Sequence, residues 1–91
     1  MSVEENILLV DDEQRLLSGL RRQLRGKFDV MTALSGEQAL RILGNRDDIA
    51  VVVCDMHMPE MTGVEVLAEF SKKSPATSRI MLTGNASQEC A

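Results

Sequence analysis

Short apolar runs alternate with amphipathic stretches along the 91-residue chain. An uninterrupted apolar run is typical of a strand buried on both faces, whereas apolar residues at every third or fourth position indicate one face of a helix. This alternation predicts a parallel sheet with helices on its faces and right-handed crossovers, an α/β fold. We expect strands at 7–10, 28–32, 49–54 and 80–82, with a helix after each of the first three.

The first predicted helix has a leucine face and a glycine stop. Leu16, Leu17, Leu20 and Leu24 recur at helical spacing and are expected to face the core, with arginines on the other side. Gly26 follows the last of these leucines, where a glycine can adopt the left-handed conformation that ends a helix. The strand that comes next, 28–32, is expected at an edge of the sheet.

Two capping boxes predict where the other helices begin. In such a box, a Ser or Thr side chain accepts from a backbone N–H three residues on, and a Glu or Gln there reaches back. Ser35 with Gln38 opens the second helix, and Thr62 with Glu65 opens the third. The residues of the third helix expected to face inward are Val64, Leu67, Ala68 and Phe70.

Charge and composition exclude several classes of protein. Ten basic and fourteen acidic residues give a net charge of −4, which argues against nucleic acid as a direct partner because phosphate binding needs clustered Lys and Arg. The longest apolar run, 49–54, is far shorter than the roughly 20 residues that span a bilayer. Cys54 and Cys90 have no metal-type spacing and are expected to be reduced thiols. These features predict a cytoplasmic location, with no membrane partner.

Polar residues follow three of the predicted strands. Asp11 and Asp12 come after the first, Asp55 after the third, and Thr83 after the fourth. Ligands bind at the carboxyl ends of strands in open parallel sheets, so we expect these side chains to meet at one rim. Crowded carboxylates repel one another unless a cation joins them, and hard oxygen ligands suit Mg²⁺.

A carboxylate beside Mg²⁺ can act as a nucleophile toward phosphorus. The rim therefore predicts Mg²⁺-dependent phosphoryl transfer onto Asp55, with a hydroxyl from Thr83 donating to a phosphoryl oxygen. The alternative is that these residues are solvated polar ends of strands. Rival phosphate chemistries lack their residues: no glycine-rich loop follows the first strand, and His57, the only histidine, stands where a haloacid dehalogenase would carry its second Asp. An enzyme acting on a separate small substrate is therefore the least favoured function.

Four segments carry a family resemblance. Residues 7–13 (ILLVDDE), 53–59 (VCDMHMP), 61–63 (MTG) and 80–84 (IMLTG) closely resemble the receiver domain of two-component response regulators. The resemblance implies a flavodoxin-like (CheY-like) three-layer sandwich with strand order 2-1-3-4, whose fifth strand and last helices are missing. On this reading, 1–91 is one receiver domain, incomplete at its C-terminus.

The resemblance also implies roles for the rim residues. Asp55 is similar to the phosphoacceptor, and Thr83 to the switch hydroxyl. Asp11 and Asp12 resemble the acidic pair that holds Mg²⁺ together with Asp55 and the backbone carbonyl of His57. The resemblance implies that the acceptor takes its phosphoryl group from a phosphohistidine on a sensor histidine kinase or a histidine phosphotransfer protein.

Three further positions belong to the loop after Asp55. The resemblance implies that the His57 imidazole tunes the lifetime of the phosphoryl group; an exposed bystander and a direct metal ligand are the alternatives. Pro59 and Gly63 are expected to set the turn geometry of the loop. The family's lysine after a fifth strand has no counterpart, because Lys72 and Lys73 precede the fourth strand.

An unfinished sheet leads to the last expectations. Residues 80–82 become an edge, and part of Val51, Val53 and Met81 or their neighbours is exposed, which favours association. We expect either a homodimer through this edge or a fragment of a longer regulator whose output domain lies outside the chain. The sequence of residues 81–84 (MLTG) is similar to the corresponding segment of receivers that are joined to HD-GYP phosphodiesterases. The alternative function is a phosphorylation-independent interaction or dimerisation module that retains the acidic pocket.

Overall fold

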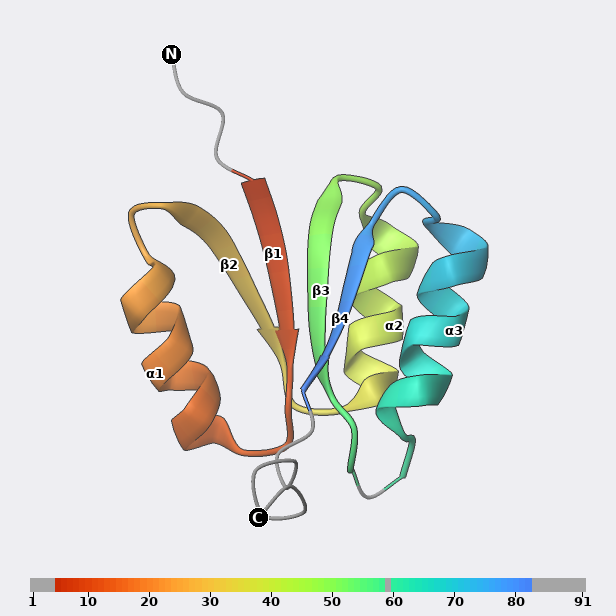
Figure 1. Ribbon diagram of the computed structural model, residues 1–91, viewed down its shortest axis with the longest axis horizontal. Helices are drawn as coiled ribbons and strands as arrows, with labels where there is room; N and C mark the ends of the chain where they lie inside the picture. Colours follow the sequence, from red (N-terminus) through yellow and green to blue (C-terminus); the bar gives the residue numbers. More distant parts are fainter. Residues whose placement is uncertain (1–4, 59, 83–91) are drawn as a thin grey trace.

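The computed structural model describes residues 5–58 and 60–82, and shows three helices and four strands in strict alternation (Figure 1). Within this part of the chain, no helix is long and apolar enough to cross a membrane. Each strand begins within two residues of its predicted start. The elements are β1 (Glu5–Val10), α1 (Gln14–Leu24), β2 (Phe28–Ala33), α2 (Gly36–Asn45), β3 (Ile49–Asp55), α3 (Gly63–Lys73) and β4 (Ser78–Leu82).

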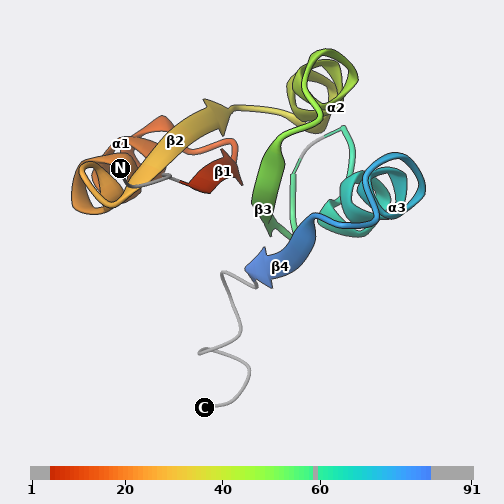
Figure 2. The same ribbon diagram turned by 90° about the horizontal axis from the view of Figure 1, so that it is seen from above.

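The four strands form one parallel sheet in the order β2-β1-β3-β4. Helix α1 lies on one face, and α2 and α3 lie side by side on the other (Figure 2). This confirms the predicted α/β fold, its strand order, and the edge position of β2. Because every strand runs in the same direction, all four carboxyl ends meet at one rim, and the crossovers return along the helices.

Two apolar clusters hold the layers together, one on each face of the sheet. Side chains alternate between the faces along a strand, so Leu8 and Val10 of β1 pack toward α2 and α3, whereas Ile7 and Leu9 pack toward α1. The larger cluster lies under α2 and α3 and includes the completely buried Phe70. The central strands are apolar over 7–10 of β1 and 49–54 of β3, because both of their faces are covered there.

Helix α1 ends as predicted, but its inner face is narrower than expected. Gly26 has φ +94°, the left-handed conformation that glycine adopts without strain. Leu17 is buried, and Leu20 and Leu24 are half-buried against the sheet. The prediction for Leu16 is wrong, because its side chain is 41% exposed. One residue before Leu17, it lies about 100° around the helix from the buried stripe.

Both predicted caps are present, and one of them differs in detail. The Thr62 hydroxyl accepts from the Glu65 N–H at 3.2 Å, and the Glu65 carboxylate accepts from the Thr62 N–H at 2.9 Å. At α2, the Ser35 hydroxyl accepts from the Gln38 N–H at 3.1 Å. The Gln38 side chain, however, accepts from the N–H of Leu34, one residue before the cap, at 2.8 Å.

The inner face of α3 corrects two of the four predicted residues. Phe70 is fully buried and Leu67 is half-buried, as expected, but Val64 is 55% exposed and Ala68 is also exposed. The helix begins at Gly63, and positions three or four apart share a face. The buried residues of α3 are Gly63, Val66 and Phe70.

The amino end of β3 is tied to the segment before β4 by a buried hydroxyl. Thr77 is 2% exposed, and its Oγ1 donates to the backbone carbonyl of Ile49 at 2.7 Å. Its oxygen also lies 2.6 Å from the Ser74 hydroxyl. This bond fixes where the chain enters β4 and satisfies polar groups that would otherwise be buried without a partner.

Strand β4 exposes apolar side chains on the α1 face of the sheet. Ile80 is 48% exposed and Leu82 is 36% exposed. Ile80 pairs in register with Val53, which is half-buried against α1. The expectation of exposed apolar surface at this edge is therefore confirmed for residues of β4, but Met81 pairs with Cys54 and lies on the opposite face.

Candidate functional site

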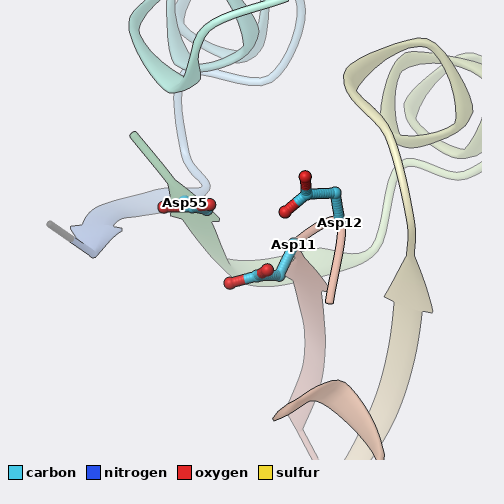
Figure 3. Close-up of side chains that lie close together, drawn as sticks. All are labelled: Asp11, Asp12 and Asp55. Carbon is cyan, nitrogen blue, oxygen red and sulfur yellow. The ribbon is translucent and has the colours of Figure 1, made fainter. Parts of the chain in front are cut away.

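Three carboxylates from two neighbouring strands meet at the carboxyl rim of the sheet. Asp11 and Asp12 follow β1 directly, and Asp55 is the last residue of β3. One ligating oxygen from each lies within 4.8 Å of the other two. In Figure 3 the side chains of all three point toward a common space. The convergence predicted from three strand ends is therefore confirmed for these carboxylates.

Asp11 is held rigidly by backbone hydrogen bonds. Its N–H donates to the Ala33 carbonyl at 3.0 Å, which continues the β1–β2 pairing past the end of the strand. Its Oδ1 accepts from the Glu13 N–H at 2.8 Å. The side chain is only 6% exposed. Asp11 therefore presents one carboxylate oxygen in a fixed position, whereas the neighbouring Asp12 is exposed and free to adjust.

Asp55 is positioned by β4 on one side and by the following loop on the other. It pairs in register with Leu82, and the Met56 N–H donates to the Leu82 carbonyl at 2.9 Å. The His57 N–H donates to Asp55 Oδ1 at 3.3 Å. Asp55 is half-buried, so its carboxylate is both oriented by the backbone and open to a reactant.

The charged form of Asp11 is disfavoured by its surroundings. Burial raises the pKa of Asp11 above its usual value, and the nearby charges of Asp55 and Asp12 raise it further. The Glu13 N–H opposes this by stabilising the charged form. The same environment acts on Cys54, whose thiol is buried and has its pKa raised to about 12, mainly by burial and then by Asp55 and Asp11. Cys54 is therefore an inert core thiol and not a nucleophile.

The donor set fits Mg²⁺. Three carboxylates with ligating oxygens this close supply only hard oxygen ligands, which Mg²⁺ prefers. Mg²⁺ typically keeps several waters and binds through one or two carboxylates, and the exposed side of Asp12 leaves room for that water shell. Burial is the main cause of the raised pKa of Asp11, and a divalent cation would offset the smaller part that comes from the charges of Asp55 and Asp12.

Gly63 places α3 against the phosphoacceptor candidate, a role that the sequence interpretation missed. A Cβ at Gly63 would overlap the backbone carbonyl oxygen of Asp55. Gly63 was expected to set a loop turn, but it is the first residue of α3 and does not have a positive φ. The sequence did contain a signal for this role. Glycine is a poor helix former, so a glycine at the first position of a well-capped helix indicates that there is no space for a side chain.

Several predicted site residues remain predictions. Thr83 and Pro59 lie outside the described residues. The His57 side chain is exposed, and its contact with Asp55 is through its backbone N–H. Metal binding by its backbone carbonyl, and tuning by its imidazole, are therefore predictions that the geometry neither requires nor contradicts.

No lysine lies at the acidic rim. The chain has only three, Lys27, Lys72 and Lys73. Lys27 precedes β2, and the other two form the last turn of α3, so all three lie toward the amino ends of the strands. The expectation that neither Lys72 nor Lys73 can serve as a rim lysine is confirmed.

The sequence model of the response regulator receiver domain family matches residues 7–91. The chain belongs to this family. The receiver is thus a signalling domain of two-component systems, and the acidic cluster described above is its most distinctive feature.

Known proteins similar to this receiver are named for different activities. Over 86 residues it is 40% identical to the hydrogenase transcriptional regulatory protein HoxA of Cupriavidus necator, a match that covers 94% of this chain but 18% of HoxA. The chain thus spans less than a fifth of that relative's length. Its fold is similar to a crystal structure of an adenylate cyclase from Rhodopirellula baltica, with TM-score 0.86, 38% identity, and coverage of 97% of this chain and 67% of that one.

A third similar protein was crystallised with a metal and a fluoride. The response regulator TrrA from Thermotoga maritima, in complex with Mg²⁺-BeF, matches with TM-score 0.80 and 30% identity, over 91% of this chain and 75% of that chain. At this level of identity the likeness extends beyond the fold to the family.

Proposed function

We propose that this receiver accepts a phosphoryl group on Asp55 while Asp11, Asp12, Asp55 and the backbone carbonyl of His57 hold Mg²⁺. The observation that carries the proposal is the convergence of three carboxylates within 4.8 Å at the carboxyl rim. The three carboxylates differ in burial: Asp11 is buried and fixed, Asp12 is exposed and adjustable, and Asp55 is half-buried. Together they can perform two tasks, holding a cation and attacking phosphorus.

The transfer itself needs one nucleophile and one activated donor. A carboxylate oxygen of Asp55 attacks the phosphorus of a phosphohistidine, a P–O bond forms, the P–N bond breaks, and the partner's imidazole leaves and takes up a proton. Mg²⁺, when bound, supplies charge neutralisation for the phosphoryl oxygens. Asp55 is oriented for attack by the His57 N–H and by its register with Leu82.

The two remaining carboxylates have different duties in this proposal. Asp11 is held by the Glu13 N–H and keeps one oxygen in place, so it fixes the position of the cation. Asp12 is exposed and accommodates the cation's water shell. Thr83 is the residue after Leu82, the partner of Asp55 in the sheet, and in the proposal its hydroxyl follows the phosphoryl group as the switch.

The single histidine of the chain, His57, lies only two residues after the acceptor, so in this proposal the phosphohistidine belongs to a partner protein. We therefore infer a cytoplasmic sensor histidine kinase or histidine phosphotransfer protein as the donor, and no catalysis on a separate substrate. The output lies outside the receiver: HoxA is named a transcriptional regulator and the Rhodopirellula protein an adenylate cyclase, so similarity of the receiver does not fix the output class.

Acetyl phosphate tests the phosphoacceptor directly. The chain is incubated with Mg²⁺ and acetyl phosphate, and its intact mass is measured. We expect a single phosphate adduct on the wild type and none on Asp55→Asn. Asp48→Asn is the matched control, because it makes the same charge change at the amino end of β3 and should retain the adduct.

A folded wild-type chain that binds Mg²⁺ and yields no adduct would overturn the assignment of Asp55. Folding is checked by far-ultraviolet circular dichroism and Mg²⁺ binding by shifts of the backbone amides of Glu13 and His57, whose N–H groups contact the cluster. Chelation with EDTA should abolish the adduct, because the cation is needed to offset charge on the phosphoryl oxygens.

One observation favours a second function, association through β4. Ile80 and Leu82 expose apolar surface on a strand that is an edge within the described residues. A second copy of the chain suits this edge, because a two-fold axis would pair identical strands and bury these side chains from both copies. Sedimentation equilibrium should then show a concentration-dependent dimer that Ile80→Lys dissociates. A wild type that remains monomeric at the highest concentration tested would exclude this function.

A further inference from the structure

The open edge of β2 borders a hollow of about 510 Å³. The strand lies at the end of the sheet, with α1 on one side and α2 on the other (Figure 2). Val30, Met31 and Thr32 of β2 line the hollow. None of the three clustered carboxylates lines the hollow, so it is distinct from the acidic cluster.

Free backbone groups of β2 face this hollow. The Ala33 carbonyl accepts from the Asp11 N–H and so points toward β1. Backbone N–H and C=O groups alternate in direction along a strand, so those of Met31 point toward β1, and those of Val30 and Thr32 point outward. The edge therefore offers two N–H donors and two carbonyl acceptors at the spacing of a strand.

The hollow carries positive charge in its own walls. Arg21 of α1, Arg41 of α2 and Arg46 after α2 line it, and no carboxylate of the described residues does. Arg46 is already engaged by Asp48, with Nη2–Oδ2 at 2.8 Å. Arg41 has only a long, exposed contact with Glu37 at 3.6 Å. Arg21 makes no ion pair within the part of the chain that the structure describes, so Arg21 and Arg41 are available to an added carboxylate.

The surroundings on the α1 side reinforce this charge. Helix α1 contains no acidic residue. Arg22 and Arg25 line a second hollow, of about 300 Å³, together with Arg21. Asp29, the second residue of β2, lines a third hollow with Arg21 and Arg25. Cations therefore outnumber carboxylates along the α1 flank of the edge.

We propose that the open edge of β2 binds an extended acidic segment of a partner protein, which adds to the sheet as a strand while Arg21 and Arg41 hold its carboxylates. Met31 and Ile42 are half-buried in the walls and provide apolar contact for side chains that alternate with the acidic ones. Paired backbone donors and acceptors at strand spacing require a polypeptide, which favours this partner over a nucleic acid. The proposal does not depend on phosphorylation of Asp55.

The test uses a fluorescently labelled peptide in which glutamate and valine alternate. Fluorescence anisotropy with the full chain should show saturable binding that weakens as salt is raised. Arg21→Gln combined with Arg41→Gln should weaken it roughly tenfold, since two partly exposed ion pairs are removed. The matched control is Arg15→Gln combined with Arg79→Gln, which makes the same charge change on α1 and β4 but outside the hollow and should leave affinity unchanged within about twofold.

The backbone part of the proposal has its own measurements. Bound peptide should slow hydrogen exchange at the amides of Val30 and Thr32. A peptide with N-methyl groups on alternate residues should bind at least tenfold more weakly, because it cannot complete the ladder. Thr32→Pro removes an outward N–H, a change that edge strands tolerate. If Thr32→Pro fails to fold, as judged by circular dichroism, the methylated peptide still decides the question.

Three outcomes would overturn the proposal. Absence of saturable binding at low salt would mean that the arginines only guard the edge against pairing. Equal binding of a lysine–valine peptide would remove the role of charge. Binding of a single-stranded oligonucleotide or of the methylated peptide with the same dependence on Arg21 and Arg41 would show a general anion site without strand addition.

Discussion

Gly63 at the start of α3 lies directly against the backbone of Asp55. A Cβ on Gly63 would overlap the Asp55 carbonyl oxygen and would lie 3.0 Å from the Met56 Cα. The Gly63 N–H also donates to the Met56 carbonyl at 3.1 Å. The first turn of α3 is therefore in direct contact with the end of β3. The position of the candidate phosphoacceptor depends on residue 63 being a glycine, which has no side chain.

Gly63→Ala should disturb the site and the fold together. The added methyl must push α3 away from β3, which costs about 1–3 kcal/mol of unfolding free energy as overpacking does elsewhere. Mg²⁺ affinity should fall as Asp55 shifts from Asp11. Urea unfolding and a Mg²⁺ titration measure the two effects.

Gly19→Ala is the control for this substitution. Gly19 lies inside α1, and a Cβ added there would meet nothing within 4 Å, so the same change should stabilise the chain by about 0.5–1 kcal/mol through helix propensity. If the two variants behaved alike, the contact between Gly63 and Asp55 would not constrain the structure.

Asp11→Asn should stabilise the metal-free chain at neutral pH. Burial, and then the charges of Asp55 and Asp12, raise the pKa of Asp11 above 3.8 in the native state. The native state therefore binds this proton more tightly than the unfolded chain, and stability declines as pH rises from 3.8 through the raised pKa. Asparagine removes this dependence. Urea unfolding in EDTA across acid and neutral pH measures it.

Mg²⁺ should reverse the ranking of the two proteins. A cation at one hundred times its Kd adds about 2.7 kcal/mol to the wild type, and Asp11→Asn should lose most of this gain. Asp48→Asn is the control of opposite sign: the Arg46 side chain lowers the pKa of Asp48, so its contribution is present above pH 3.8 and is lost as pH falls. A metal-free Asp11→Asn chain less stable than wild type at neutral pH would contradict the raised pKa of Asp11.

Thr62→Ala should remove the cap of α3. The Thr62 hydroxyl accepts from the Glu65 N–H, and loss of such a cap costs about 1 kcal/mol. Ser71→Ala, an exposed substitution inside the same helix, should change stability by no more than about 0.5 kcal/mol. Equal losses from both substitutions in urea unfolding would show that the cap contributes nothing.

Thr77→Val should destabilise the chain without changing its shape. The substitution leaves the buried Ile49 carbonyl without the donor that now lies 2.7 Å away, at a cost of about 1–3 kcal/mol. Ser78→Ala, on the neighbouring exposed residue, is expected to stay within about 0.5 kcal/mol of wild type. Thermal or urea unfolding of both variants tests whether the hydroxyl anchors β4.

The sequence predicted the sheet and the acidic cluster because both depend on local signals. Apolar runs mark buried strands, and the residue after each run must lie at the rim, so Asp11 and Asp55 could be brought together from the order of the elements. Because all the predicted strands are parallel, their carboxyl ends lie at the same edge of the sheet, and the position of the rim could be predicted without knowing how the side chains pack. Lys72 was excluded from that rim by the same topological argument.

Other features depended on tertiary geometry that periodicity leaves open. A helical repeat indicates that one face is buried but fixes its phase poorly, which is why Leu16 and Val64 were placed inside and are exposed. The Gln38 side chain was predicted to accept from the Ser35 N–H and instead accepts from the Leu34 N–H. The path of the chain before the cap decides between these two donors, and the sequence pattern does not fix that path. The approach of Gly63 to Asp55 depends on how α3 meets β3.

Asp11 and Asp55 stand 44 positions apart in the chain, so the acidic cluster exists only after β1 and β3 have paired across the intervening elements. Long-range pairings of this kind must overcome a loop-closure entropy before they form. A cation would find all three carboxylates together only in the folded chain, so we expect Mg²⁺ to act mainly by slowing unfolding. Its expected effect is a longer lifetime of the folded receiver, with little change in its rate of formation.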